Sequence, residues 1–253
     1  MAVLKLVLAY DGTDFRGFAR QPGQRTIQGV LEDALTVAIG AAPRLSAAGR
    51  TDAGVHAEGQ VISFESEAEP RRVQRALNRM LGPEVVVVDA RRVPAGFDAR
   101  HSATSREYRY RVRTGPVPDP FTARYEWHRP GSYRLSVMRQ AARDLLGTHD
   151  FASFCRPGGR ATVRTLQRLS IRRVGEVLEF RARADGFLHQ MVRSLVGTLV
   201  AVGAGKIDPH AIPSILAARS RSAAGPVAPA DGLVLVSVHY GGSRRNPVGV
   251  SAS

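Results

Sequence analysis

The residue types that suit chemistry on a polar substrate gather in one short segment, Gly49-Arg50-Thr51-Asp52-Ala53-Gly54-Val55-His56. A carboxylate that acts as a nucleophile or base must be accessible and yet firmly held. Gly49 and Gly54 allow sharp backbone turns and a close approach of substrate. Arg50, two residues before Asp52, can keep the carboxylate ionised. The same residues also suit an ordinary Asx-turn with a surface arginine.

A second segment, residues 106–113, alternates strictly between two kinds of side chain, as in a strand with two different faces. One face carries Tyr108, Tyr110 and Val112, and the other carries Arg109, Arg111 and Arg113. A row of arginines suits a phosphate backbone, and a tyrosine ring is a flat platform for a base. The alternative is a half-buried strand with its tyrosines in the core and its arginines in water.

A third candidate, Arg193, lies in the clearest predicted helix, residues 187–201. Apolar side chains recur there at helical spacing, and Arg193 lies just off the apolar stripe. A desolvated arginine beside such a stripe usually pairs with a carboxylate, and Asp52 is a candidate partner. The alternative is a solvated helix arginine.

The charge of the chain indicates a polyanionic partner. There are 36 basic and 22 acidic side chains in 253 residues, which leaves a formal net charge of +14. Each arginine or lysine placed against a phosphate releases condensed counterions, so nucleic acid is the favoured partner. An anionic membrane surface or a ribosome is the competing partner. Hydrophobic residues make up 43% of the chain, enough for a globular fold.

The number of cysteines, the spacing of the histidines and the hydropathy of the chain narrow the possible classes of protein further. Cys155 is the only cysteine, so an intrachain disulfide and a zinc site with several cysteine ligands are excluded. The seven histidines are scattered, and no metal site is expected. No apolar run is long enough to span a bilayer, and no signal peptide is recognisable. We expect a soluble, cytoplasmic protein that does not associate with membranes.

Periodicity, caps and turn residues predict the remaining elements. Helices are expected at 27–39 between an N-cap at Thr26 and a stop at Gly40, at 71–81, at 136–146 with Ser136 as cap, and after Asp208. Strands are expected at 3–10, 60–65, 85–89, 166–174, 176–184 and 233–240, with a turn at Gly175.

This pattern predicts an α+β fold with a largely antiparallel sheet. Residues 1–100 form the predicted N-terminal half, which carries the Asp52 loop, and residues 101–241 form the C-terminal half. The tail, residues 242–253, is expected to be disordered. The sequence has no short-period repeat, and the residues leave open whether the halves are structural duplicates.

Several of these segments together resemble the tRNA pseudouridine synthase A family, in the same order and across about residues 4–240. The matching motifs are residues 10–18, 25–32, 49–57, 97–104 with 108–110, 147–151, and 187–193 with 196–197. The segment around Asp52 is the most specific of them. One departure follows Phe18, where the family often has an aromatic-Gln step and this chain has Ala19-Arg20-Gln21.

The resemblance implies the pseudouridine synthase fold: two similar halves, a central mostly antiparallel sheet flanked by helices, and a basic cleft between the halves. It implies an isomerase that converts uridine to pseudouridine at positions 38–40 of the tRNA anticodon stem-loop. It also implies a homodimer in which tRNA contacts both subunits, with no cofactor and no metal.

The resemblance also implies roles for individual residues. Asp52 is the catalytic nucleophile, acting at the sugar by attack on C1′ or by support of a glycal-type intermediate. Tyr108 packs on the flipped base, and its hydroxyl is a candidate for proton transfer. Arg193 pairs with Asp52. Arg50, or a neighbouring cleft arginine, helps to fill the space that the base vacates.

Three other functions compete with this interpretation. A non-catalytic tRNA-binding or chaperone protein would use the same basic cleft, but binding alone needs no carboxylate there. A methyltransferase would need a glycine-rich cofactor loop after a strand, which the sequence lacks. A structural ribosomal protein fits poorly with so large an apolar core.

Overall fold

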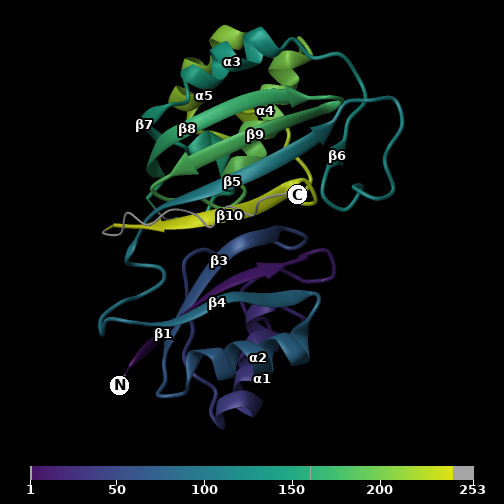
Figure 1. Cartoon of the computed structure of the whole chain (residues 1–253). Helices are drawn as coiled ribbons and strands as arrows, with labels where there is room; N and C mark the ends of the chain where they lie inside the picture. The colour runs from purple at the N-terminus through teal and green to yellow at the C-terminus, as the bar shows by residue number, and fades with distance from the viewer. Residues whose placement is uncertain (1, 160, 242–253) are drawn as a thin grey trace.

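The strands of the chain join into one continuous sheet of mixed, mostly antiparallel pairing (Figure 1). The computed structural model describes residues 2–159 and 161–241. Within these residues the sheet has ten strands in the order β4-β1-β3-β10-β5-β9-β8-β7, with β2 added to β3 and β6 to β5. The α+β class and the antiparallel sheet are as predicted.

The first hundred residues supply one part of this sheet and two helices. In chain order these elements are β1 (Val3–Tyr10), α1 (Ile27–Ile39), β2 (Ser46–Ala47), β3 (His56–Glu65), α2 (Pro70–Leu81) and β4 (Val85–Val93). Both β3 and β4 are four residues longer than their predicted strands.

The rest of the chain supplies the larger part. Its strands are β5 (Ala103–Arg113), β6 (Trp127–His128), β7 (Gly147–Asp150), β8 (Val163–Val174), β9 (Val177–Ala184) and β10 (Leu233–Tyr240). Its α-helices are α3 (Leu135–Arg143), α4 (Met191–Gly203) and α5 (Ile212–Ala218). Three short 3-10 turns lie at Ala152–Phe154, Pro209–Ala211 and Arg221–Ala223.

The two parts arrange their strands in the same way. In the first, β1 lies between its antiparallel neighbours β4 and β3. In the second, β5 lies between its antiparallel neighbours β10 and β9. In each, the first strand therefore sits between the last strand and an inner one, and helices fill the connections. The two halves therefore resemble each other in strand topology, and this resemblance does not require that their sequences be similar.

A parallel contact between β10 and β3 joins the two parts, with Val234 opposite His56 and Leu235 opposite Ala57. Gly59 allows the strands to come this close. A Cβ atom built there would lie 2.3 Å from the carbonyl oxygen of Val236. The last strand of the chain thus joins the two halves at the start of β3, which directly follows the loop that carries Asp52.

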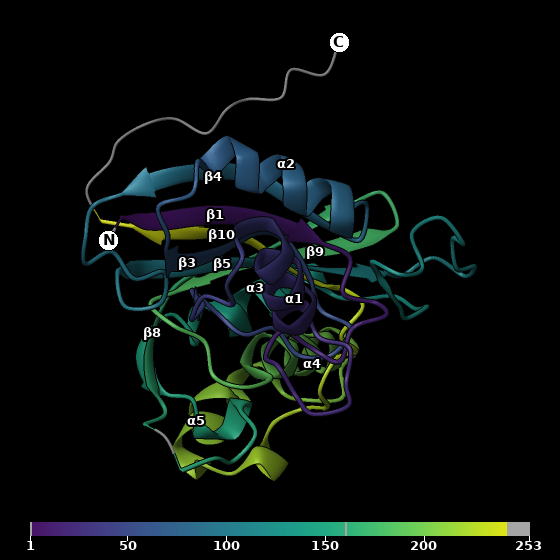
Figure 2. The same ribbon diagram turned by 90° about the horizontal axis from the view of Figure 1, so that it is seen from below.

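One face of the sheet is apolar and carries α3, α4 and α5, which all lie on one side of the sheet in Figure 2. Alternate residues of the strands bury their side chains under the helices, including Leu4, Leu6, Leu8, Tyr110 and Val112. The other alternate residues form the opposite face.

Capping and turn residues explain where several elements begin and end. Thr26 caps α1 by accepting a hydrogen bond from the Gly29 amide, and Gly40 ends the helix with φ of 78°. Gly175 turns between β8 and β9 with φ of 57°. Asp208 accepts from the His210 amide at the start of a 3-10 turn. These four predictions are confirmed.

Two predicted helices differ from the structure. The helix expected at 187–201 begins at Met191, because Gln190 adopts a left-handed conformation with φ of 63° and residues 187–189 stay outside the helix. The helix expected at 136–146 is α3, which begins one residue earlier, after Arg134, without a side-chain cap. The predicted disordered tail lies outside the described residues. Among the described residues, no helix has the length and apolarity that a bilayer crossing requires.

The close approach at Gly59 generates a stability prediction. Gly59→Ala should lower the free energy of unfolding by about 1–3 kcal/mol, because the added methyl group collides with backbone of β10 and must push the strand away. Chemical denaturation followed by circular dichroism measures the change.

Gly186→Ala is the matched control. The nearest atoms to a Cβ there belong to the flexible side chain of Arg164, at 3.4 Å, so little should change. Equal stability of the Gly59 variant and the wild type would contradict a tight β3–β10 junction.

Candidate active site

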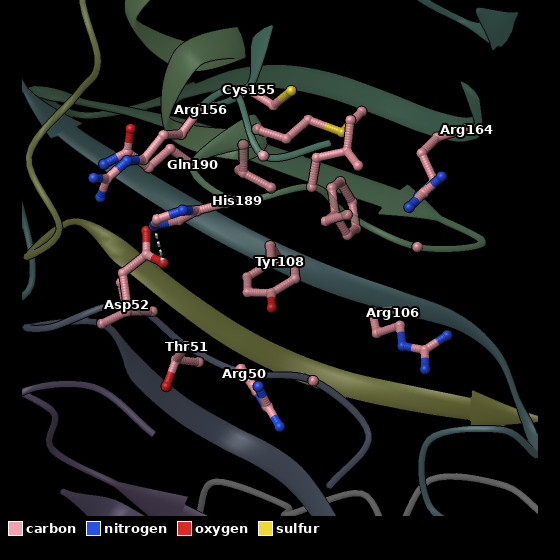
Figure 3. Close-up of a pocket in the computed structure, with 18 of the residues that line it drawn as sticks. Arg50, Thr51, Asp52, Arg106, Tyr108, Cys155, Arg156, Arg164, His189 and Gln190 are labelled. Carbon is pink, nitrogen blue, oxygen red and sulfur yellow. Dashed lines mark ion pairs between the residues drawn. The ribbon is translucent and has the colours of Figure 1, made fainter. Parts of the chain in front are cut away.

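A cavity of about 800 Å³ lies where the two parts of the chain meet. The loop at residues 47–52 lines one side. The C-terminal part lines the other with residues of β5, of the segments 155–159 and 186–190, and of the first turn of α4. Figure 3 shows Asp52, Tyr108 and His189 facing this space.

The loop that carries Asp52 is held from below by the segment after β1. The Tyr10 hydroxyl shares a hydrogen bond of 2.8 Å with the Thr51 hydroxyl, and the Phe18 amide donates to the Thr51 carbonyl. Gly17, with φ of 93°, lies so close that a Cβ there would be 3.0 Å from the same carbonyl. The opening motif of the sequence therefore acts as a base for the Asp52 loop.

The far end of the same loop is fixed at the start of β3. The ring of His56 is buried, and its Nδ1 atom accepts a hydrogen bond from the Gly12 amide at 3.1 Å. The same Nδ1 atom lies 3.0 Å from the carboxylate of Asp11. The exit of the loop is thus tied to the turn that follows β1, and Asp52 is held between two anchored ends.

The carboxylate of Asp52 contacts two basic side chains from the other part of the chain. One oxygen accepts a hydrogen bond from Nη1 of Arg193 at 3.1 Å, and the other lies 3.3 Å from Nε2 of His189. Only 23% of the Asp52 side chain and 16% of the Arg193 side chain are exposed. Ion pairs that are shielded in this way are little screened by salt, and these two contacts hold the carboxylate in one orientation.

Arg193 is itself held in place by the backbone. Its Nε atom donates to the carbonyl of Ala228 at 2.7 Å, while its own carbonyl accepts from the Ala228 amide. Arg193 is the third residue of α4, so Asp52 meets the N-terminal end of this helix, where the helix dipole also favours a negative charge. The structure thus brings together Asp52 and Arg193, two of the residues singled out from sequence.

Tyr108, the third of these residues, lies beside Asp52 in the cavity wall and is 8% exposed. The ring of Phe187 packs edge-on against it, with 5.1 Å between ring centroids. Burial, then the neighbouring Tyr10 and Asp52, raise the pKa of the Tyr108 phenol well above its usual range. At neutral pH the group is therefore a neutral hydroxyl, able to donate a proton or hydrogen bond.

Arg50 does not contact Asp52. Its side chain is exposed and points away from the carboxylate, towards the outer side of the loop (Figure 3). The expected contact of Arg50 with Asp52 is not formed, because the loop turns the two side chains in different directions. Arg193 and His189 supply the positive charge from across the cavity.

The predicted row of arginines for a phosphate backbone is also wrong in part. Arg109 pairs with Glu58, and both Arg111 and Arg113 pair with Glu126, whose side chain is 1% exposed. These pairs lie on the face of the sheet away from the cavity, since Tyr108 and its alternate neighbours face the helices. The row is neutralised by carboxylates that sequence alternation does not reveal.

Sequence reasoning missed two residues of the site. The sequence places His189 in a predicted helix and in a matching motif without assigning it a role; in the structure the left-handed Gln190 starts the helix after it, and His189 lies at the cavity. Arg106 was read as one more strand arginine. All five of its N–H groups donate to backbone carbonyls, those of Ala48, Arg100, Ala103 and Asp185.

In residues 2–159 and 161–241, no three side chains of histidine, cysteine, aspartate or glutamate gather where they could hold a metal ion. The side chains that line the cavity include the carboxylate of Asp52, the phenol of Tyr108 and several basic groups.

Comparison with known proteins gives consistent matches over most of the chain. The sequence profile described as tRNA pseudouridine synthase matches residues 6–102 and 141–241. The tRNA pseudouridine synthase A of Halalkalibacterium halodurans is 45% identical over 239 residues, which cover 92% of this chain and 91% of that one. The enzyme of the same name from Bacillus subtilis is 44% identical over 245 residues, covering 94% of this chain and 98% of its own.

Proposed function

Because the chain belongs to the tRNA pseudouridine synthase family, we propose that it isomerises uridine to pseudouridine at positions 38–40 of the tRNA anticodon stem-loop. The observation that carries the proposal is the carboxylate of Asp52, held by Arg193 in a cavity beside Tyr108. A net charge of +14 supports an RNA substrate.

The reaction breaks the bond between C1′ of the ribose and N1 of uracil, and it forms a bond between C1′ and C5. C5 loses a proton and N1 gains one, so the isomerisation balances without any other reactant. A uracil within stacked RNA is inaccessible, and the target nucleotide must be flipped out. A cavity of about 800 Å³ has room for the flipped nucleotide.

Asp52 acts at the sugar. Its carboxylate either attacks C1′ or supports loss of a C2′ proton on the way to a glycal-type intermediate, and the geometry is compatible with both routes. In either route the anion must be kept from turning or taking up a proton. The two contacts from Arg193 and His189, one to each carboxylate oxygen, serve that purpose.

Tyr108 serves the base. Its ring is a flat surface at the cavity wall, fixed by Phe187. Its raised pKa keeps the hydroxyl protonated at neutral pH, and the hydroxyl has no hydrogen-bond partner among the described residues. Tyr108 lines the cavity, so the hydroxyl is available to the substrate and is placed to exchange a proton with the uracil.

Arg50 belongs to the proposed site as a contact to the RNA at the outer side of the loop. We also propose a cytoplasmic homodimer in which one tRNA contacts both subunits, on the basis of the family resemblance. The alternative of a tRNA-binding protein without catalysis leaves unexplained why two basic side chains hold a carboxylate inside the cavity.

Asp52→Asn should abolish pseudouridine formation, because an amide can neither attack C1′ nor accept a proton. Binding of tRNA should stay within about tenfold of wild type, since phosphate contacts dominate affinity. Release of tritium from C5-labelled uridine in a tRNA transcript measures turnover, and filter binding measures affinity.

The control is Asp144→Asn, an exposed carboxylate at the end of α3, which should behave as wild type. Detectable turnover by the Asp52 variant would sink the nucleophile assignment. A wild-type protein that binds tRNA without releasing tritium would instead favour the non-catalytic alternative.

Tyr108→Phe keeps the ring and removes the hydroxyl. We expect kcat to fall on the order of 100-fold, the usual contribution of a positioned proton-transfer group, while KM changes little. Single-turnover assays on a tRNA transcript separate the two quantities.

Tyr133→Phe serves as the comparison, because the Tyr133 hydroxyl donates to the backbone carbonyl of Arg129, outside the cavity lining. Full activity of the Tyr108 variant would mean that the ring acts as a platform and that the hydroxyl takes no part.

A further inference from the structure

A second hollow of about 810 Å³ adjoins the active-site cavity. We call it the second groove; it runs beside β2 and is lined by the segments 43–47 and 96–101 and by residues at the start of β1 and the end of β3. It shares Ala47, Arg50, Arg100 and His101 with the cavity. The two hollows are therefore adjacent, and three of the four residues that they share are basic.

Three arginines line the second groove: Arg44, Arg50 and Arg100. All three are exposed, and none of them is within ion-pair distance of a carboxylate in the described part of the chain. The arginines of β5 on the far face of the sheet behave differently, since each is paired with a glutamate. The fold thus neutralises one set of arginines and leaves the set around the groove open to an anion.

Two acidic residues, Glu65 and Asp98, line the second groove. The carboxylate of Asp98 is already engaged, because it accepts hydrogen bonds from the amides of Arg100 and His101 at 2.8 and 2.7 Å. These bonds lower the pKa of Asp98 although burial opposes them. Asp98 therefore shapes the turn that presents Arg100 and His101, and it leaves their side chains facing outwards.

We propose that the second groove binds the sugar-phosphate backbone of the nucleotides that adjoin the target uridine, with phosphates contacting Arg44, Arg50 and Arg100. The proposal rests on the proposed function, because a flipped uridine in the cavity stays linked to its neighbours. The chain must leave the cavity over some part of its wall, and the part shared with the second groove carries unpaired positive charge.

The double variant Arg44→Gln, Arg100→Gln tests the proposal with an unmodified tRNA transcript. Each lost phosphate contact should reduce the slope of log Kd against log salt by about 1, so the slope should fall by about 2. KM should rise at least about tenfold, while kcat at saturating tRNA stays near wild type because neither residue contacts Asp52.

The double variant Arg143→Gln, Arg168→Gln removes the same charge from exposed arginines on α3 and β8, outside both hollows. It should keep the wild-type slope. An unchanged slope in the groove variant, or an equal fall of the slope in both double variants, would overturn the proposal for the groove. The proposed function would still stand if the wild-type protein forms pseudouridine. Wild-type protein without pseudouridine formation would reject the function, and the salt slopes would still decide whether the groove binds RNA.

A second inference rests on Arg106 of β5. Its Nε and Nη2 atoms donate to the Ala48 carbonyl at 3.0 and 2.8 Å, and its Nη atoms also donate to the carbonyls of Arg100 and Asp185 at 2.9 and 2.8 Å. Burial lowers the pKa of this guanidinium. Because this guanidinium donates only to backbone carbonyls, it links several backbone segments to one another; we call this set of hydrogen bonds the Arg106 bracket.

These segments carry the reactive groups. Ala48 lies four residues before Asp52, Asp185 lies two residues before Phe187, which packs on Tyr108, and Arg106 shares its strand with Tyr108. We infer that Arg106 is a positioning residue that sets the separation of Asp52 from Tyr108. It spans the junction of the two halves, so loss of its fork would let the halves move apart at the cavity.

Arg106→Lys keeps the charge and loses the planar fork of five donors. We expect kcat to fall roughly 10- to 100-fold with KM near wild type, because a small displacement of catalytic groups is costly and tRNA contacts remain. Arg109→Lys, two residues along the same strand and paired with Glu58, is the control and should keep wild-type kcat.

Thermal unfolding accompanies both variants, and kcat is expressed per folded molecule. A wild-type kcat per folded molecule in Arg106→Lys would show that the bracket is merely structural and would overturn the inference. A rise in KM with unchanged kcat would overturn it as well, because it would make Arg106 a contact to RNA.

Discussion

The ion pair between Asp52 and Arg193 joins residues 141 positions apart, and it fixes what the rest of the structure must do. A carboxylate that is largely shielded from water loses hydration, so it needs a nearby cation to stay charged. Here the carboxylate comes from one half of the chain and the cation from the other. The two halves must therefore meet at a fixed distance for the site to exist.

The sheet supplies that distance. Strand β10, the last of the chain, pairs with β3 of the first half and β5 of the second, so that both halves share one set of backbone hydrogen bonds. Gly59 lets the strands approach, and Arg106 ties the loop before Asp52 to the second half. Ala48 and Arg106 both line the cavity, so the contact between them serves the junction of the halves and the geometry of the site together.

Two sets of arginines differ in their surroundings and in their physical roles. On the open face of the sheet, arginines of β5 meet glutamates and hold neighbouring segments together. Around the cavity and the second groove, Arg44, Arg50 and Arg100 have no such partner among the described residues. Unpaired charge at the rim attracts a polyanion over a distance, while the internal pair at Asp52 serves the chemistry.

The sequence by itself determined the fold class, most of the elements and the family, and it predicted the pairing of Arg193 with Asp52, because these depend on periodicity, caps and local motifs. Tertiary structure alone decided that His189 also flanks Asp52, that Arg50 turns away from it and that Arg106 donates to four backbone carbonyls. These facts depend on strand order and on the left-handed Gln190, which set which distant residues meet. Local sequence patterns do not reveal these contacts, because which charged groups pair depends on their distance in the folded chain.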